Sequence, residues 1–203
     1  ALGVIEPGAV EACRVSRHGR VGVIGTASTI RSDAYARAIG TIRPDFTVIS
    51  EPCPLFVPLA EEGWTSDDDP VTRAVAARYL ERFIQERVDT LILGCTHYPL
   101  LRGVIEKVLP GIALVDSGAA VAGDLVRTLA RLGIDGPRDD GAPGGIPSLH
   151  AQYHVTDDPE RFRSVGARFL GHEIKGPHLA DLAGMAAMKT HQRDPDHRME
   201  ERR

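Results

Sequence analysis

The segment LILGCTHYPLL, residues 91–101, places a thiol and an imidazole two positions apart at the end of an apolar run. Cys95 and His97 follow what reads as a buried strand, and the polar triplet Cys-Thr-His stands where the mouth of a sheet is expected. A thiol at a helix start beside an imidazole ionises more easily than a free thiol, whose pKa is about 8.5. The pair therefore indicates proton transfer or attack by sulfur. The alternative is a buried, hydrophobic Cys95 and a turn residue His97.

A second polar segment, GTAST at residues 25–29, also follows a predicted strand and leads into a predicted helix. Backbone N–H groups at a helix start, together with the hydroxyls of Thr26, Ser28 and Thr29, suit an anionic oxygen such as a carboxylate or phosphate. Capping of the helix by one hydroxyl explains the same residues, so both interpretations stay open. The phosphate-binding pattern G-x-x-x-x-G-K-[ST] is absent.

The three cysteines, Cys13, Cys53 and Cys95, are odd in number and widely spaced. A disulfide framework would be even and dense, so a reducing, cytoplasmic location is expected. A metal site needs three or four ligands with recognisable spacing, and no C-x-x-C accompanies Cys95 and His97, so we expect no metal. Cys13 and Cys53 are predicted to pack in the core or to lie in loops.

Composition sets wider limits. The chain has 203 residues, of which 42% are hydrophobic and 26% charged, as in ordinary globular proteins with one generous domain or two small ones. No apolar run approaches the roughly 20 residues of a membrane span. The formal net charge of -4 argues against a dedicated nucleic-acid binder. We therefore expect neither a membrane nor a nucleic-acid partner.

The elements that must position these residues alternate between strand and helix. Apolar, β-branched runs predict strands at residues 3–5, 21–24, 46–49, 90–93 and 112–115, and more weakly at 152–155. Helices are predicted over residues 29–42, 70–87, 98–109, 117–132 and 159–170, with a short one at 179–188. Asp69, Ser117 and Gly171 are the expected caps. Because most strands are continuously apolar, the prediction is an α/β fold with parallel sheets.

Taken together, five motifs resemble glutamate racemases of bacterial cell-wall synthesis. They are GVIEPGA at residues 3–9, VGVIGTAST at 21–29, CPLFVPLAEEG at 53–63, LILGCTHYPLL at 91–101 and VDSGAAVA at 115–122. The order is that of the family, the resemblance runs to about Leu170, and LGCTHYPLL is its most specific element. No matching pattern follows Lys175.

The resemblance implies an isomerase that interconverts L- and D-glutamate without a cofactor and supplies D-glutamate for peptidoglycan, and so for cell shape. Two cysteines on opposite faces of the α-carbon exchange its proton, because inversion needs removal on one face and delivery on the other. Cys95 matches the second of these cysteines, and His97 matches the histidine that assists it. Glu61, rather than Glu62, matches the family's carboxylate.

By the same resemblance, Thr96 and His97 lie in the substrate-binding motif, and Thr26 and Thr29 line the pocket for the substrate's carboxylates. The family's first-half motifs are not found in these residues, and the chain begins with Ala. Asp116-Ser117-Gly118 looks like one of them but belongs to the family's late segment. We therefore expect these 203 residues to lack one half of the active site and to be inactive alone.

The family has two pseudo-symmetric α/β lobes, of which the first is expected to be incomplete here. Residues 14–116 would form the complete second lobe, which carries Cys95. Residues 1–13 and 117–174 would be remnants of the first lobe, packed as an incomplete sheet with an exposed apolar edge, and residues 175–203 a disordered tail.

Two other functions compete with racemisation. One is a racemase-like module that binds an amino acid without turnover. The other is a thiol hydrolase or transferase that uses Cys95 and His97 as a nucleophile pair. A homodimer is left open.

Overall fold

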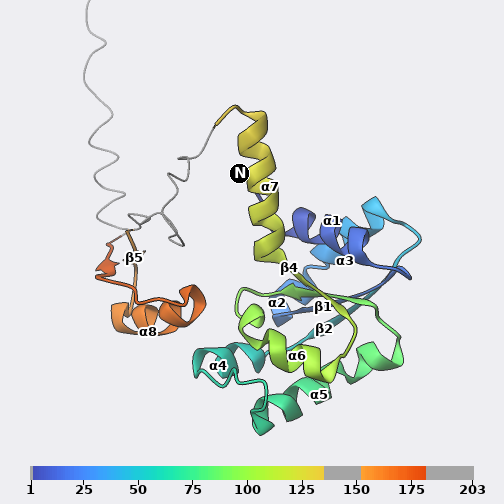
Figure 1. The fold of residues 1–203 in the computed structure, drawn as a ribbon, viewed down its shortest axis with the longest axis horizontal. Coiled ribbons are helices and arrows are strands. Elements are labelled where there is room, and N and C mark those ends of the chain that lie inside the picture. Colours follow the sequence, from blue (N-terminus) through green and yellow to red (C-terminus); the bar gives the residue numbers. More distant parts are fainter. Residues whose placement is uncertain (1, 135–151, 182–203) are drawn as a thin grey trace, which may run out of the picture. The chain divides into compact units, whose positions relative to one another are not determined.

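The computed structural model describes residues 2–134 and 152–181, which fall into two compact units, residues 1–138 and 139–203. The first unit contains an alternating series of helices and strands (Figure 1). In chain order these are α1 (Ile5–Val15), β1 (Arg20–Gly25), α2 (Ala27–Arg31), α3 (Ala34–Ile42), β2 (Thr47–Pro52), α4 (Phe56–Glu61), α5 (Pro70–Gln85), β3 (Thr90–Gly94), the 3₁₀ helix η1 (Tyr98–Leu101), α6 (Arg102–Val108), β4 (Ala113–Asp116) and α7 (Ser117–Arg131).

The four strands form one parallel sheet in the order β2-β1-β3-β4. The chain leaves β1 for a strand on one side, β2, and later crosses to β3 and β4 on the other side. The direction in which successive strands are added to the sheet therefore reverses between β1 and β3. In open parallel sheets this switch point, at the carboxyl ends of the strands, is where ligands bind. The fold class is α/β, as the sequence predicts.

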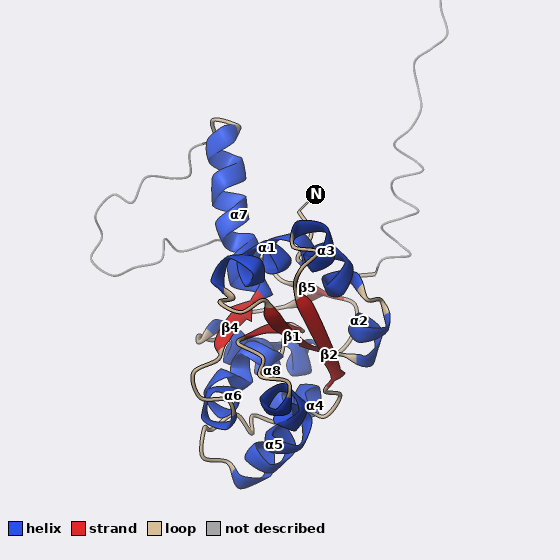
Figure 2. Cartoon of the chain, turned by 90° about the vertical axis from the view of Figure 1, so that its right-hand side faces the viewer, coloured by secondary structure: helices blue, strands red, loops and turns tan. Residues whose placement is uncertain are grey.

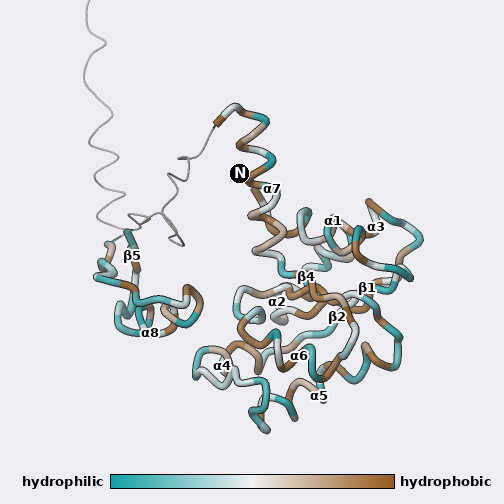
Figure 3. The backbone as a smooth tube through the Cα atoms, in the orientation of Figure 1, coloured by the Kyte–Doolittle hydropathy of each residue, from teal (hydrophilic) through white to brown (hydrophobic). Residues whose placement is uncertain are grey.

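Helices cover both faces of the sheet, as Figure 2 shows. Val21 and Val23 of β1 pack with α1 and α3 on one face. Ile24 of β1 packs on the other face with α4, α5, η1 and α6. Because both faces are buried, the central strands are mainly apolar, as at residues 21–24 of β1 and 91–93 of β3 (Figure 3).

Several helix boundaries follow from local chemistry. Asp69 caps α5 by accepting a hydrogen bond from the Thr72 N–H at 2.8 Å, and Pro70 occupies the first helical position, where it loses no intrahelical bond. The helix predicted over residues 29–42 is instead two helices, α2 and α3. Asp33 separates them with a φ of 53°, a left-handed conformation that no helix interior contains.

The strand predicted at residues 3–5 is wrong, because Ile5 begins helix α1. Ile5, Ala9 and Ala12 recur at helical spacing and all pack into the core against α3 and the sheet. The three-residue apolar run was too short to tell a strand from the first turn of this stripe. Residues 5–13 therefore pack against the same sheet as residues 20–116.

Two other expectations need correction, and one helix was not predicted. The helix predicted over residues 98–109 begins as η1 and continues as α6. Asp116, rather than Ser117, caps α7, since its carboxylate accepts from the N–H groups of Gly118 and Ala119. Helix α4, which carries Glu61, was not predicted, because Pro58 in the run PLFVPLAEEG reads as a loop signal.

Helix α7 is poorly covered. Ser117 is its one buried residue, while the apolar side chains of Leu125, Val126 and Leu132 are 42%, 66% and 66% exposed. This helix therefore leaves an apolar face uncovered among the described residues of the first unit. The assignment of residues 117–174 to an incomplete first lobe stays a prediction.

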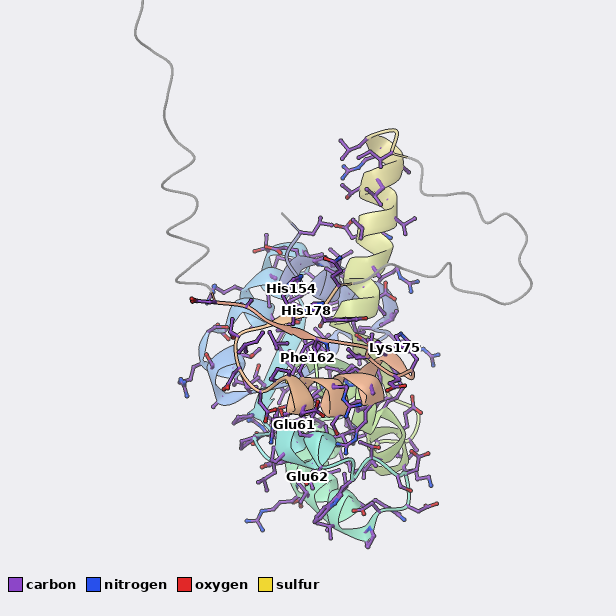
Figure 4. All side chains as sticks on the ribbon, turned by 90° about the vertical axis from the view of Figure 1, so that its left-hand side faces the viewer. Glu61, Glu62, His154, Phe162, Lys175 and His178 are labelled. Atoms are coloured by element: carbon purple, nitrogen blue, oxygen red, sulfur yellow. The ribbon has the colours of Figure 1, made fainter. Side chains whose placement is uncertain are left out.

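The described part of the second unit contains β5 (His154–Val155), α8 (Pro159–Leu170) and β6 (His178–Leu179). The two strands pair in parallel, with His154 opposite His178 (Figure 4). Helix α8 matches its predicted range, and Gly171 ends it with a φ of 69°. Leu179 lies in β6, so the helix predicted at 179–188 does not begin there. Residues 182–188 and most of the predicted tail lie outside the described residues.

No described helix is both long enough and apolar enough to cross a lipid bilayer.

Candidate active site

Thr26 and Cys95 lie on either side of the switch point of the sheet. Gly25, the last residue of β1, is in register with Gly94, the last residue of β3. Adjacent strands are about 4.8 Å apart, so the two residues that follow these glycines leave the sheet next to each other. The two polar segments singled out in the sequence are therefore brought to one place.

Gly94 is required by the close approach of the backbone at this point. A Cβ atom on Gly94 would lie 2.7 Å from the Ile24 carbonyl oxygen and 3.2 Å from the ring of Tyr35. Tyr35 itself is buried, and its hydroxyl lies 2.7 Å from the Ser117 hydroxyl, which in turn donates to the Leu93 carbonyl at 3.4 Å. Tyr35 and Ser117 therefore pack closely against the end of β3, the strand that precedes Cys95.

Cys95, His97 and Glu61 form a continuous chain of polar contacts. The Cys95 Sγ atom is 3.8 Å from the His97 Nδ1 atom, and the His97 Nε2 atom is 3.2 Å from the Glu61 Oε1 atom. The side chains of His97 and Glu61 are 23% and 25% exposed, so this contact is largely shielded from water. The Thr96 hydroxyl is a further neighbour of His97, at 3.3 Å from Nδ1.

The Glu61 carboxylate influences which nitrogen of the His97 ring carries a proton. An ionised Glu61 has only acceptor oxygens, so it favours the state of His97 that carries a proton on Nε2. In the neutral ring Nδ1 is then an acceptor, and it faces the thiol of Cys95. This arrangement lets His97 take the thiol proton and leaves the resulting imidazolium between a thiolate and a carboxylate.

Glu61 reaches His97 because of the short helix α4. Glu61 is the last residue of α4, and Glu62 is its C-cap (Figure 4). A step of one residue turns a helix by about 100°, so the two neighbouring glutamates point in different directions. Glu62 is exposed, whereas Glu61 is half-buried against His97. The choice of Glu61 over Glu62 agrees with this geometry, although the catalytic role remains a proposal.

The electrostatics of the site hold Cys95 as a thiol in the absence of substrate. Burial raises the pKa of Cys95 above its ordinary value, and hydrogen bonds from Thr96 and from the His97 backbone lower it by less. A partly buried thiolate is costly without a nearby cation. Chemistry at Cys95 therefore needs a proton acceptor, and His97 is the group in place.

The threonines form a small hydroxyl pair beside this chain of contacts. Thr26 caps α2, accepting from the Thr29 N–H at 3.3 Å, and the two hydroxyl oxygens are 3.0 Å apart. The capping interpretation is thus confirmed. Both side chains remain partly accessible at the carboxyl edge of the sheet, so capping does not preclude contact with a ligand.

The other two cysteines play no part in this arrangement. Cys53 is wholly buried in the core beneath α4, where burial strongly raises its pKa. Cys13 lies on α1, and burial raises its pKa as well. Among the described residues, no group of three or more His, Cys, Asp or Glu side chains is arranged to hold a metal ion.

Two clefts of the first unit lie away from Cys95. One, of about 310 Å³, is lined by α1, β4 and α7 and includes Glu11 and Arg127. The other, of about 540 Å³, lies between α1 and α3 and includes Glu6 and Arg37. Neither is lined by Cys95, His97 or Glu61, so the thiol chemistry belongs to the strand edge and not to these clefts.

Reasoning from the sequence missed Tyr98, which directly follows His97. Its side chain is fully buried, and its hydroxyl donates to the Cys53 carbonyl at 2.8 Å. A tyrosine followed by Pro-Leu-Leu looks like an ordinary core residue, and only its position beside His97 could have drawn attention to it.

Comparison with known proteins gives a consistent result. The curated relatives include glutamate racemases from Geobacter metallireducens, 47% identical over 191 residues, and from Neisseria gonorrhoeae, 38% identical over 181 residues. Each comparison covers 89% of this chain and 64% of the relative. The chain therefore spans about 64% of the length of the curated relatives it matches.

Solved structures agree with the sequence relatives. The fold is similar to a crystal structure of glutamate racemase isoform RacE1 from Bacillus anthracis, with a TM-score of 0.76 and 32% identity. It is similarly close to glutamate racemase from Francisella tularensis in complex with D-glutamate, with a TM-score of 0.75 and 34% identity. Both comparisons cover 89% of this chain and 64% of the other.

The family model described as Asp/Glu/hydantoin racemase matches residues 1–125, which include all of the sheet and every residue of the candidate site. The chain belongs to the Asp/Glu/hydantoin racemase family.

Proposed function

We propose that this chain provides one half of the active site of a glutamate racemase, with Cys95 as the base that serves L-glutamate. The observation that carries the proposal is the contact series from Cys95 to His97 to Glu61 at the switch point of the sheet. The names of the relatives support the choice of substrate, and one solved relative is in complex with D-glutamate.

The reaction needs only proton transfers. His97 Nδ1 accepts the Cys95 proton, and the thiolate then removes the α-hydrogen of L-glutamate as a proton. The S–H bond forms as the C–H bond breaks, and the electron pair stays on the α-carbon and its carboxylate. A proton delivered to the opposite face gives D-glutamate, and in the reverse direction the Cys95 thiol is the donor. Since no hydride or electron moves, the mechanism requires no cofactor.

Glu61 acts through His97, by stabilising the imidazolium that forms when the thiol ionises. The hydroxyls of Thr26, Thr29 and Thr96 are the proposed donors to the carboxylates of glutamate, since all three follow strands β1 and β3 at the same edge. A hydroxyl can donate to an anion without adding charge beside the thiolate.

The opposite face of the α-carbon needs a second base. Among the described residues, the thiol of Cys95 contacts an imidazole, while Cys53 is enclosed in the core. We propose that polypeptide beyond these 203 residues supplies that base. The residues 14–116 then act as one lobe of a two-lobe enzyme, and D-glutamate made by it in the cytoplasm serves peptidoglycan synthesis.

The test compares two polypeptides in D2O with L-glutamate and no added cofactor. One is the 203-residue chain. The other is a chimera that joins this chain to the part of the Geobacter metallireducens racemase that it does not match. Proton NMR follows loss of the α-hydrogen, and a D-amino-acid assay follows inversion. The chimera is expected to exchange and invert, and the short chain to show little inversion.

Cys95→Ser in the chimera is expected to abolish deprotonation of L-glutamate. Full racemisation by that variant would refute the role of Cys95. Robust turnover by the 203-residue chain would instead refute the proposal that the second base lies elsewhere. A covalent acyl adduct on Cys95, detected by mass spectrometry, would point to a thiol hydrolase or transferase.

A further inference from the structure

Tyr98 joins the two segments that carry the polar groups of the site. Its backbone N–H donates to the Cys95 carbonyl at 3.2 Å, which closes the turn that contains His97. Its hydroxyl donates to the Cys53 carbonyl at 2.8 Å, in the loop between β2 and α4. One buried side chain therefore bridges the end of β3 to the end of β2.

The ring of Tyr98 also packs against the helix that holds Glu61. Phe56, the first residue of α4, makes an edge-to-face contact with Tyr98, with ring centroids 5.3 Å apart and planes at 89°. Both rings are fully buried. Edge-to-face pairs add to the stabilisation that comes from their buried area and restrict the orientation of both rings.

These contacts affect the distance between the Glu61 carboxylate and the His97 ring. Glu61 lies five residues after Phe56, at the far end of a single short helix, so a tilt of α4 moves its carboxylate directly. His97 is bonded in sequence to Tyr98. A hydrogen bond at 3.2 Å between Glu61 and His97 weakens steeply if the two segments separate, and the Tyr98 side chain is the buried tie that opposes such separation.

The Tyr98 hydroxyl is suited to a lasting hydrogen bond with the Cys53 carbonyl. Burial raises the pKa of Tyr98 far above its ordinary value, with smaller contributions from Cys53, Cys95 and Tyr79. The hydroxyl therefore stays protonated, and so a donor to the Cys53 carbonyl, at every pH at which Cys95 is proposed to pass its proton to His97.

We propose that Tyr98 is a positioning residue, which holds α4 against the turn of residues 95–98 and so keeps Glu61 within hydrogen-bond reach of His97. The inference rests on the function proposed for this site and deepens it. Tyr98 does not touch the reacting atoms, and it acts on Cys95 through the orientation of the imidazole.

The test uses the 203-residue chain and two readouts that involve no glutamate. The first is the ¹⁵N chemical shifts of the His97 ring, which report which nitrogen carries the proton. The second is the rate of Cys95 alkylation by iodoacetamide between pH 6 and 10, read by peptide mass mapping so that Cys13 and Cys53 are counted separately. The variants are Tyr98→Phe and, as a reference for a lost carboxylate, Glu61→Gln.

Tyr35→Phe is the matched control. It also removes a hydroxyl from a buried tyrosine, whose partner is Ser117 at 2.7 Å, but Tyr35 packs with α1 and α3 on the other face of the sheet. Thermal unfolding of both variants shows how much stability each hydroxyl contributes. A purely structural effect would therefore appear in both variants alike.

Tyr98→Phe is expected to move the His97 signals toward those of Glu61→Gln. It should also slow Cys95 alkylation at pH 7.5 by about threefold to tenfold, equivalent to a rise of up to one unit in the Cys95 pKa. Tyr35→Phe should leave the His97 signals unchanged, because Tyr35 packs with α1 and α3 and not with α4. Unchanged His97 signals in Tyr98→Phe, or equal changes in the two variants, would overturn the inference.

Phe56→Leu supplies a second variant if Tyr98→Phe does not fold. It removes the ring contact but keeps the hydroxyl, and His97 is expected to shift in the same direction. Wild-type His97 signals in Phe56→Leu would then overturn the inference. If instead the chimera fails to racemise glutamate while these shifts occur, the proposed function fails and the positioning of His97 by Tyr98 stands.

Discussion

His97 and Glu61 are 36 positions apart in the sequence, yet the Nε2 atom of one lies 3.2 Å from the Oε1 atom of the other. The contact joins the segment after β2 to the segment after β3, two strands that are separated in the sheet by β1. It holds the His97 ring so that its Nδ1 atom points toward the Cys95 thiol. A thiol with a raised pKa thereby gains a directed proton acceptor.

Glu61→Gln tests the carboxylate directly. The amide has no charge to stabilise an imidazolium, so kcat for glutamate in the chimera should fall by about tenfold or more. The loss is expected to be smaller than the roughly 10²–10⁴-fold contribution of a positioned acid–base group, because Glu61 acts through His97. Glu62→Gln is the control, because Glu62 is exposed and adjacent. Equal effects of the two substitutions on kcat would contradict the assignment of Glu61.

Gly94→Ala tests the close approach at the switch point. The new Cβ would lie 2.7 Å from a backbone oxygen of Ile24, so the two central strands must separate. Overpacking of this kind costs about 1–3 kcal/mol, and denaturant unfolding should show a loss of that size together with altered Cys95 alkylation.

Gly40→Ala is the matched control for Gly94→Ala. It lies within α3 and has open space where the Cβ would stand. Alanine in a helix interior is favoured over glycine by about 0.5–1 kcal/mol, so this variant should be more stable. Destabilisation by Gly40→Ala, or a neutral Gly94→Ala, would contradict the packing described for these positions.

Thr29→Val separates substrate binding from thiol chemistry. The valine keeps the shape of the side chain but cannot donate to a carboxylate. Because hydrogen bonds to charged groups contribute about 1.5–3 kcal/mol, the KM for glutamate in the chimera should rise about tenfold or more. The pH profile of Cys95 alkylation should not change. An unchanged KM would exclude Thr29 from the carboxylate site.

Cys53→Ala makes a prediction about pH and stability. The pKa of Cys53 is raised in the folded chain, so the fold binds the protonated thiol more tightly than the unfolded chain does. Its contribution is complete below the unfolded pKa of about 8.5 and declines as the pH rises above it, by up to about 1.4 kcal/mol per pH unit. The free energy of unfolding in urea should therefore fall more steeply between pH 8.5 and 10 for the wild type than for Cys53→Ala. Parallel curves would show that Cys53 is not buried as described.

The sequence was sufficient to predict the four strands of the main sheet. The runs at residues 21–24, 46–49, 90–93 and 112–115 are mainly apolar, which is the pattern of strands covered on both faces, and each overlaps a strand in the structure. The placement rule for parallel sheets then put Thr26 and Cys95 at one edge, and their strands are in register there.

Other features depend on contacts between distant residues and could not be read locally. Ile5 begins a helix because Ala9 and Ala12 fit against the sheet, which an apolar triplet does not reveal. Helix α4 forms despite Pro58 because its own residues Phe56 and Leu59 are buried in the core. The preference for Glu61 came from a family resemblance, since no spacing rule pairs position 61 with position 97.

The pairing of Gly25 with Gly94 also determines when the site can assemble during folding. β1 and β2 can pair once residue 52 has been made, but β3 reaches the centre of the sheet only after the α5 crossover is complete. Closing such a long loop is slow compared with forming a helix or a turn. We therefore expect Cys95 to stay apart from Glu61 until β3 pairs with β1. During refolding, the moment at which Cys95 acquires the alkylation rate of the folded chain would therefore report when β3 pairs with β1.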